Sequence, residues 1–260
     1  MDESRRSFLK GIGVAAAAAG LGCTFPLLRA LASSGTPAAG VQTRQLCMVI
    51  DIEKCLNEDL IKDCTEACRI EHNLPGGESD PERQIRWMWT QKFEHTFPDQ
   101  AHSLTPKELR GEQVPVMCNH CTNPACVKVC PTKATWKRES DGVVMMDMHR
   151  CIGCRYCVVG CPYGARSFNW HEPRPHIKNI RPEYPTRMRG VVEKCTFCAE
   201  RLREGREPAC VEAANRITEG AMTFGELSDP NSKVSALLKT TRTISRQNAL
   251  GTGPNVYYIV

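Results

Sequence analysis

Short apolar runs separated by glycine, proline and charged residues form the main hydrophobic pattern of this 260-residue chain. Residues 46–51 (LCMVID) predict a first strand, and residues 84–90 (QIRWMWT) alternate between apolar and polar positions as a half-buried strand does. Asp141-Gly142, between two β-prone segments, is typical of a hairpin turn. The remaining short strands are predicted at residues 134–139, 143–148 and 165–170. This pattern predicts an α+β protein with short hairpins, short helices and long loops.

The N-terminal run of small apolar residues has a different meaning. Residues 4–10 (SRRSFLK) are a twin-arginine export signal, and residues 11–22 are its weakly apolar stretch. This stretch is rich in alanine and shorter than the ~20 residues that a membrane span needs. We therefore predict a signal peptide over residues 1–32, which contains Cys23, and a flexible linker over residues 33–43. Because the twin-arginine route exports folded proteins, it predicts a periplasmic protein whose cofactors are inserted before export.

Eight of the sixteen cysteines form two runs in the middle of the chain. Residues 151–162 (CIGCRYCVVGCP) have the C-x2-C-x2-C-x3-C-P spacing of bacterial ferredoxins, and residues 118–131 repeat it with a two-residue insertion. In this pattern, three cysteines of one run and the last cysteine of the other run hold each cluster. The spacing therefore predicts two [4Fe–4S] clusters. Their ligands are Cys118, Cys121, Cys126 and Cys161 for the first, and Cys151, Cys154, Cys157 and Cys130 for the second.

Zinc sites and disulfides are the alternatives for an exported chain that is rich in cysteine. A zinc site closes with four ligands and does not need two paired runs that each end in Cys-Pro. Disulfide partners are rarely separated by only two residues at four successive places. The doubled pattern therefore favours iron–sulfur clusters over a zinc-binding or disulfide-stapled protein.

Three further side chains carry weaker signals. His120 lies between two predicted ligands, where an imidazole either tunes a cluster by hydrogen bonding or faces solvent. We expect His120 to face solvent. Trp87 and Trp89 are expected to pack in the core rather than to relay electrons, since large aromatic side chains dominate small cores.

Two further regions, one before and one after the central runs, contain three cysteines each. They are Cys55, Cys64 and Cys68 in the first region, and Cys195, Cys198 and Cys210 in the last. Only the Cys64-x3-Cys68 end of the first region has ferredoxin spacing. In the last region, Ala214 occupies the place of the fourth cysteine.

Four cysteine regions, an insertion between Cys198 and Cys210, and the ending GTGPNVYYIV resemble the iron–sulfur subunits of the molybdopterin oxidoreductase superfamily. These include subunits of polysulfide, dimethyl sulfoxide and nitrite reductase systems, and the resemblance covers nearly all of residues 44–260. It implies two pseudo-symmetric lobes of the bacterial-ferredoxin type. The implied parts are a central lobe (118–170), an outer lobe (44–117 and 171–227) and a tail that packs on the domain (228–260).

Within this superfamily, the export signal and the segments CTEACRIEHNLP and IRWMWTQKFEHTFPDQ are similar to the DsrO branch. DsrO proteins are periplasmic ferredoxin-like subunits of the DsrMKJOP membrane complex of dissimilatory sulfur metabolism. The chain also resembles the corresponding subunit of Hdr-like menaquinol-oxidising complexes. The resemblance implies a non-catalytic electron-transfer subunit, attached peripherally to a membrane complex. Its implied partners are an NrfD-like quinone-binding membrane subunit, a multihaem cytochrome c and other subunits of a Dsr-type complex.

The alternative function is the middle iron–sulfur subunit of a periplasmic molybdopterin reductase of the polysulfide, dimethyl sulfoxide or nitrite type. A subunit of this kind has the same fold and the same clusters. The two functions differ in the partner proteins.

The resemblance also implies the number of clusters. In the outer lobe of the family, one cluster is held by three cysteines of the last region and by the final cysteine of the first. The matching residues here are Cys195, Cys198, Cys210 and Cys68. The other outer cluster lacks ligands from both regions, so the resemblance implies three [4Fe–4S] clusters. Two alternatives stay open for the spare cysteines: an irregular remnant site, or a disulfide or free thiols. The cysteines concerned are Cys55 and Cys64, with Cys47 as a third member of a remnant site.

The charge of the chain argues against nucleic-acid binding. The formal net charge is +5, and loss of the signal peptide, which carries four basic and two acidic residues, lowers it to +3. Each oxidised cluster with four thiolates adds roughly −2. Three clusters therefore bring the loaded protein to about −3, so the basic residues mostly offset the charge of the clusters.

Overall fold

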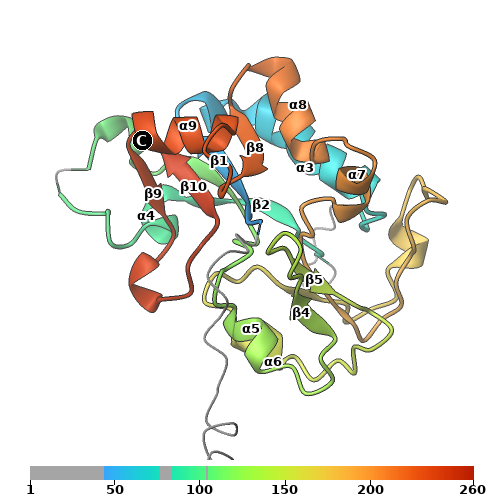
Figure 1. Ribbon diagram of the computed structural model, residues 1–260. Helices are drawn as coiled ribbons and strands as arrows, with labels where there is room; N and C mark the ends of the chain where they lie inside the picture. Colours follow the sequence, from blue (N-terminus) through green and yellow to red (C-terminus); the bar gives the residue numbers. More distant parts are fainter. Residues whose placement is uncertain (1–43, 77–83, 104) are drawn as a thin grey trace, which may run out of the picture. The chain divides into compact units, whose positions relative to one another are not determined.

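The computed structural model describes residues 44–76, 84–103 and 105–260 (Figure 1). The predicted signal peptide and linker, residues 1–43, lie outside this part of the chain. The described residues belong to one compact unit that spans residues 43–260. Among them, no helix is both long enough and apolar enough to cross a membrane.

A four-stranded sheet brings together the two ends of this unit (Figure 1). Its central strands are β1 (Leu46–Asp51) and β10 (Val256–Ile259), which run parallel to each other. The outer strands, β8 (Met222–Glu226) beside β1 and β9 (Thr243–Ser245) beside β10, are antiparallel to their neighbours. The predicted first strand is confirmed with its predicted bounds, and the C-terminal residues belong to the same sheet.

Both faces of β1 are buried up to its last residue, Asp51, which explains why residues 46–50 are all apolar. Met48 belongs to the main core, together with residues of α3 (Glu58–Glu71) and α8 (Ala209–Ile217). Cys47 belongs to a separate small cluster with Val234 of α9 (Lys233–Thr240). Because successive side chains of a strand point to opposite faces, Cys47 lies on the side of the sheet away from the main core.

Helix α3 differs from the expected short helices, since residues 58–71 form one helix of 14 residues. Asn57 caps its first turn: the side chain accepts hydrogen bonds from the backbone N–H groups of Asp59 (2.9 Å) and Leu60 (3.4 Å). Leu60, Cys64 and Cys68 recur every four residues and form the buried face of the helix. The cysteines of this region therefore follow a helical period as well as a ligand spacing.

The central cysteine runs surround a short hairpin. Its strands, β4 (Thr135–Lys137) and β5 (Val144–Met146), are antiparallel, as predicted. Gly142 in the turn has a φ of 73°, in the left-handed region that favours glycine. The one-turn helices α5 (Ala125–Lys128) and α6 (Tyr156–Val159) lie in the two cysteine runs. The predicted α+β fold with short hairpins and short helices is confirmed.

The strand predicted over residues 84–90 is shifted towards the C-terminus. Strand β2 spans Met88–Lys92 and pairs with β3 (Gln113–Met117). The preceding residues do not join this ladder, because the backbone of Arg86 donates to and accepts from the hydroxyl of Ser167 (2.9 and 3.2 Å). Trp87 is buried, as expected, and Trp89 is only partly buried.

The remaining elements of the described chain are short. Strands β6 and β7 pair over two residues each, and the others are single helical turns. Their bounds are β6 Ser167–Phe168, β7 Val192–Glu193, α4 Phe93–Thr96 and α7 Ala199–Arg203, with 3-10 turns at Lys54–Leu56, Lys107–Leu109, Arg174–His176 and Asn248–Leu250.

Replacing Tyr258 by alanine is expected to lower the free energy of unfolding by about 3–5 kcal/mol, the range for large aromatic residues in cores. Tyr258 is fully buried, its ring lies edge-on to Phe97 with centroids 4.9 Å apart, and its hydroxyl donates to the carbonyl of Pro115 (3.2 Å). Anaerobic urea denaturation measures the change. Tyr257→Ala is the matched control, because Tyr257 is partly exposed on the other face of the sheet. Equal losses in the two variants would contradict this description of the core.

Candidate metal centres

The fifteen cysteines in the described ranges are all free thiols. Twelve of them are the predicted cluster ligands, and we name their three groups set A, set B and set C. Set A is Cys118, Cys121, Cys126 and Cys161; set B is Cys130, Cys151, Cys154 and Cys157; set C is Cys68, Cys195, Cys198 and Cys210.

Set A combines the loop after β3 with the cysteine that follows α6. Burial, followed by the thiols of Cys118, Cys126 and Cys161, raises the pKa of Cys121 to about 12. After burial, the thiols of Cys118 and Cys126 also raise the pKa of Cys161. The structure therefore brings Cys161, from the second run, within electrostatic reach of three cysteines of the first.

Set B lies around α6 and the loop before β4. Cys130, Cys151 and Cys157 pack in one small apolar cluster, and Cys154 is half-buried on the loop before α6. Burial acts to raise the pKa of Cys130, but hydrogen bonds from the backbone of Thr135 and its neighbours lower it below the ordinary value. Such N–H···S bonds favour the thiolate, which is the form that binds iron.

Set C combines one cysteine from the N-terminal part of the unit with three from its C-terminal part. Cys68 lies in the last turn of α3 and Cys210 in the first turn of α8, and these two helices pack against each other (Figure 1). Cys195 and Cys198 lie between β7 and α7. Burial raises the pKa of Cys68, and the thiols of Cys198, Cys195 and Cys210 raise it further. The structure thus brings all four sulfurs of set C together.

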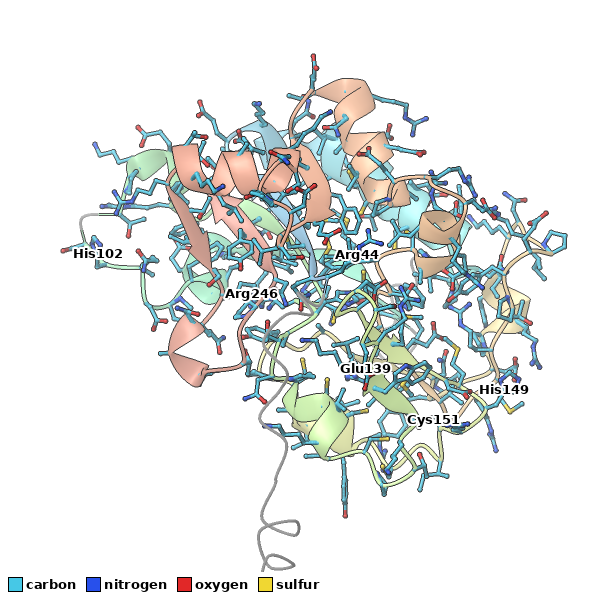
Figure 2. All side chains as sticks on the ribbon, viewed as in Figure 1. Arg44, His102, Glu139, His149, Cys151 and Arg246 are labelled. Atoms are coloured by element: carbon cyan, nitrogen blue, oxygen red, sulfur yellow. The ribbon has the colours of Figure 1, made fainter. Side chains whose placement is uncertain are left out.

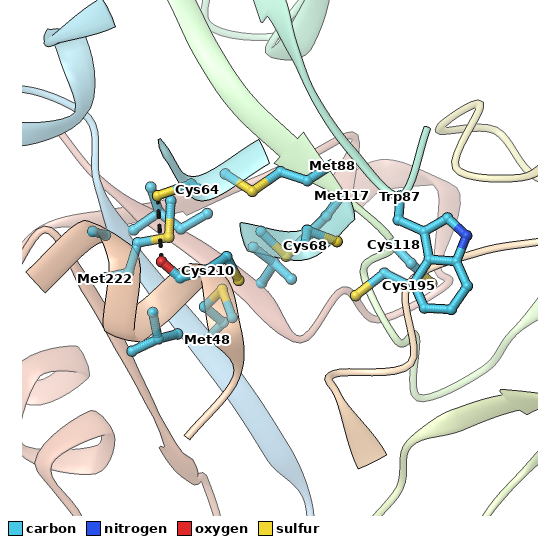
Figure 3. Packing of buried hydrophobic residues seen from close by; sticks show 14 of the residues in the cluster. Met48, Cys64, Cys68, Trp87, Met88, Met117, Cys118, Cys195, Cys210 and Met222 are labelled. Atoms are coloured by element: carbon cyan, nitrogen blue, oxygen red, sulfur yellow. Dashed lines mark hydrogen bonds between the residues drawn. The ribbon is translucent and has the colours of Figure 1, made fainter. Parts of the chain in front are cut away.

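The three sets form a row with set A in the middle. After burial, the thiol of Cys118 in set A is the strongest influence that raises the pKa of Cys195 in set C. Figure 3 shows these two cysteines beside each other. At the other end, the thiol of Cys126 in set A contributes to the raised pKa of Cys157 in set B, which burial dominates. The packing agrees, since Cys126 shares an apolar cluster with three cysteines of set B and Cys118 shares the main core with Cys195 of set C. Set A therefore adjoins both other sets, and we write their order as B–A–C.

Cys55 and Cys64 are embedded in the main core. Both are fully buried, and their thiols donate hydrogen bonds to backbone carbonyls: Cys55 to Ala221 (3.5 Å) and Cys64 to Cys210 (3.3 Å; Figure 3). Burial raises the pKa of each to about 12. Both are therefore held as protonated thiols.

Apolar side chains surround these two thiols. Met48, Met222, Leu60 and Ala214 belong to the same core cluster and are fully buried, and Figure 3 shows Met48 and Met222 around the Cys64–Cys210 contact. Cys47 lies on the opposite face of β1, in the cluster with α9. The structure therefore does not bring Cys47 together with the other two spare cysteines.

The donor sets fit [4Fe–4S] clusters in number and chemistry, since four thiol sulfurs match the four corners of one cubane. In the described part of the chain, no three cysteine, histidine or carboxylate groups lie close enough to share a single metal ion. Several buried polar atoms beside the cysteines have no hydrogen-bond partner among the described residues. They are Nε2 of His72 and of His120, the amide of Asn119 and the hydroxyl of Thr196. Buried polar atoms without a partner are rare in folded proteins, and these four residues all lie within four positions of a predicted ligand in the sequence.

His120 is fully buried, so the expectation that it faces solvent is wrong. Its ring stacks on Phe197 with centroids 3.7 Å apart, and its Nδ1 accepts the backbone N–H of Val144 (3.1 Å). With Nδ1 as acceptor, the neutral ring carries its proton on Nε2. Burial holds the pKa of His120 well below its ordinary value. Phe197 comes from a distant part of the chain, so the local sequence carries no signal for this packing.

Sequence reasoning also missed three buried polar side chains next to the sets: His72, Arg166 and Lys194. Nδ1 of His72 lies 2.9 Å from the carbonyl oxygen of Cys68. Arginine and lysine are usually exposed and histidine is intermediate, so residue type alone does not predict full burial for any of the three. The sole sequence signal is position, since Lys194 directly precedes Cys195 and His72 follows Cys68 by one helical turn.

Comparison with known proteins identifies the family. The pattern of a family described as "4Fe-4S dicluster domain" matches residues 109–176, which contain sets A and B, and that of the "TAT (twin-arginine translocation) pathway signal sequence" matches residues 4–22. The chain is 42% identical over 273 residues to "Hdr-like menaquinol oxidoreductase iron-sulfur subunit 1" of Archaeoglobus fulgidus, covering 98% of this chain and 97% of the relative. The chain belongs to the iron–sulfur subunits of molybdopterin oxidoreductase-type complexes.

Two more members of this family are similar over most of their length. A tetrathionate reductase subunit of Salmonella typhimurium is 35% identical over 265 residues, covering 100% of this chain and 89% of the relative. The "Menaquinone reductase, iron-sulfur cluster-binding subunit" of Nitratidesulfovibrio vulgaris is 35% identical over 232 residues, covering 82% and 87%. Membership confirms the predicted class of iron–sulfur subunit, and the signal indicates export across the membrane. The DsrO branch, the ligand sets and the number of clusters stay predictions.

Replacing Cys68 by alanine is expected to remove one cluster, about four irons per chain, because Cys68 belongs to set C. Cys64→Ala is the matched control, one turn away on α3, and should leave all clusters in place because this thiol bonds to a backbone carbonyl. Quantitative EPR of the dithionite-reduced proteins measures the loss. If both variants lose the same signal, Cys64 is a ligand and the assignment of set C is wrong.

Proposed function

We propose that the chain is a periplasmic, non-catalytic subunit that passes single electrons along three [4Fe–4S] clusters held by sets B, A and C. The observation that carries this proposal is the row of three four-cysteine sets inside one compact unit. When bound, each cluster supplies a one-electron redox centre. The residues of the chain hold the sulfurs at fixed places, exclude water and offset charge.

The surroundings of the spare cysteines support three clusters in preference to four. The thiols of Cys55 and Cys64 already bond to backbone carbonyls, and Ala214 stands where the family places a ligand. A cubane at this place would have to displace the packed apolar side chains around them, among them Met48 and Leu60. We therefore propose that the hydrophobic core occupies the place of a fourth cluster.

The proposed setting is a quinone-linked membrane complex. Two relatives are named for menaquinol or menaquinone, so the proposed electron partner on one side is the menaquinone pool, reached through an NrfD-like membrane subunit. On the other side we propose a multihaem cytochrome c or another redox subunit. The export signal supports an exchange of electrons in the periplasm, with the chain attached peripherally to the complex. Within this setting, the finer proposal is a Dsr-type complex of dissimilatory sulfur metabolism.

A second candidate is the middle subunit of a periplasmic molybdopterin reductase. The similarity to the tetrathionate reductase subunit, which covers the whole of this chain, favours it. Both candidates use the same row of clusters and differ only in the proteins at its ends.

The set B end of the row is the proposed contact with a redox partner. Tyr156 and Val159 of α6 and the nearby Ile152 are 63%, 87% and 67% exposed, and α6 also carries Cys157 of set B. Groups of exposed apolar side chains are typical of contact surfaces. All four cysteines of set C are buried, so electrons reach the surface more directly at set B.

Purification of the native complex from membranes tests the proposed function. We expect the chain to copurify with an integral membrane subunit and a c-type cytochrome. A reduced menaquinone analogue should then bleach the visible absorption of the clusters under anaerobic conditions. The same chain separated from the membrane subunit is the control and should not respond. A pterin-containing subunit in the preparation would favour the second candidate, and loaded clusters that ignore the quinol would contradict the quinone-linked role.

The double variant Arg5→Lys, Arg6→Lys is expected to abolish export, leaving cluster-loaded protein in the cytoplasm. The twin-arginine route requires this pair and carries folded proteins. Immunoblots of periplasmic and cytoplasmic fractions, with iron analysis of the latter, measure the outcome. Arg29→Lys makes the same exchange outside the motif and should export normally. An undiminished periplasmic yield of the double variant would show that another signal directs the chain.

A further inference from the structure

Five cationic side chains of arginine and lysine are buried in the described part of the chain: Arg166, Arg187, Lys194, Arg201 and Arg246. Arg187 pairs with Glu193, and Arg201 pairs with two glutamates. The other three have no carboxylate partner among the described residues. An unpaired buried charge is costly, so each of the three needs another source of negative charge or of strong hydrogen bonds.

One of the three, Arg246, contacts groups other than the cysteine sulfurs. It lies over the ring of Tyr163, 5.3 Å from the centroid, and donates to the side chain of Gln91 (3.1 Å). Figure 2 shows it below β9, on the side of the molecule away from Cys151. The remaining two cations lie directly beside the predicted ligands.

Arg166 lies between set A and set B. Its guanidinium donates to the hydroxyl of Thr135 (2.8 Å) and contacts the sulfur of Met146 (3.7 Å). Met146 packs in the small apolar cluster that contains Cys157 of set B and Cys126 of set A. Cysteines of both sets therefore lie around the contact of this cation with Met146, at the junction of two neighbouring sites.

Lys194 lies between set A and set C. It is 1% exposed, and its ammonium donates to the carbonyl oxygens of Cys195 (2.7 Å) and of Val144 in β5. The same residue, Val144, donates its backbone N–H to Nδ1 of His120 (3.1 Å), and His120 stands between Cys118 and Cys121 of set A. This second cation therefore adjoins a ligand of set C on one side and the ligand loop of set A on the other.

Reduction adds one negative charge to a cluster. A cation held nearby in a medium of low polarity stabilises the reduced form and raises the reduction potential. An arginine remains charged at all accessible pH values. A cation at each junction therefore acts on both clusters that meet there, and the middle cluster is influenced by both.

We propose that Arg166 and Lys194 are the buried counter-charges of the row B–A–C, and that each raises the reduction potentials of the two clusters at its junction. This proposal rests on the proposed three-cluster function. In this proposal the two residues set the reduction potentials of the clusters and do not contact a substrate.

The test is an anaerobic redox titration of the native complex, followed by EPR, in two charge-removing variants. At a fixed potential, Arg166→Gln should lower the ratio of reduced to oxidised cluster about tenfold for sets A and B. This corresponds to a fall of about 59 mV in their reduction potentials, with the potential of set C unchanged. Lys194→Met should do the same for sets A and C, with set B unchanged. Signals are assigned by their loss in Cys68→Ala for set C and in Cys130→Ala for set B.

Three controls separate charge from packing. Arg166→Lys and Lys194→Arg keep the charge and should keep the native potentials. Arg150→Gln removes a cation next to Cys151 that is exposed and paired with Asp147 (3.4 Å), and solvent screening should leave every potential unchanged.

Each outcome decides the proposal. Fully loaded charge-removing variants with native potentials would overturn it, as would an equal shift in Arg150→Gln. If the charge-removing variants fail to bind clusters, native potentials in the charge-keeping variants support the proposal. If the charge-keeping variants also fail to bind clusters, the two residues have a packing role and the proposal is overturned. Native protein without clusters would refute the proposed function and this proposal together, whereas normal clusters with unshifted potentials refute this proposal alone.

Discussion

Burial of thiol groups in sets of four is the constraint on which the rest of the structure depends. In sets A and C, burial and neighbouring thiols together raise the pKa of Cys121 and Cys68. Each thiolate in a set therefore makes deprotonation of the next thiol less favourable. Metal ligation requires the thiolates, and the positive charge of iron offsets their mutual repulsion. We therefore expect folding and cluster binding to be coupled in this chain. A cytoplasmic loading step before export, as the signal implies, follows from the same coupling.

The two ends of the row differ in how much secondary structure and apolar core surrounds the thiols. Around set B the chain offers a two-strand hairpin, one-turn helices and a small apolar cluster. Around set C it offers a four-stranded sheet, the long helix α3 and most of the main core. The proposed loss of a fourth cluster explains this asymmetry, because apolar side chains pack around Cys55 and Cys64, whereas we propose that clusters fill the corresponding places in sets A, B and C. Stability at the set C end should depend less on iron than stability at the set B end.

The sequence allowed the central part to be predicted because ligand spacing is a local property. The runs that contain Cys118 and Cys151, the hairpin at Gly142 and the strand at residues 46–51 all follow from neighbours in the chain. Helix α3 escaped prediction because its buried period coincides with cysteines that also suggest ligand loops. The burial of His120 escaped because it depends on Phe197, and the burial of Lys194 because it depends on a carbonyl of β5. These are contacts between distant segments, which periodicity and composition do not encode.

The number of clusters tests the account most directly, because the order of the sets, the filled place around the spare cysteines and the charge balance all assume three. Iron and acid-labile sulfide should be determined per chain in the native, anaerobically purified protein. Three cubanes predict about 12 of each, since a [4Fe–4S] cluster contains four irons and four sulfides. Values near 16 would contradict the account, because a fourth cluster would then occupy the place that we assign to the hydrophobic core around Cys55 and Cys64.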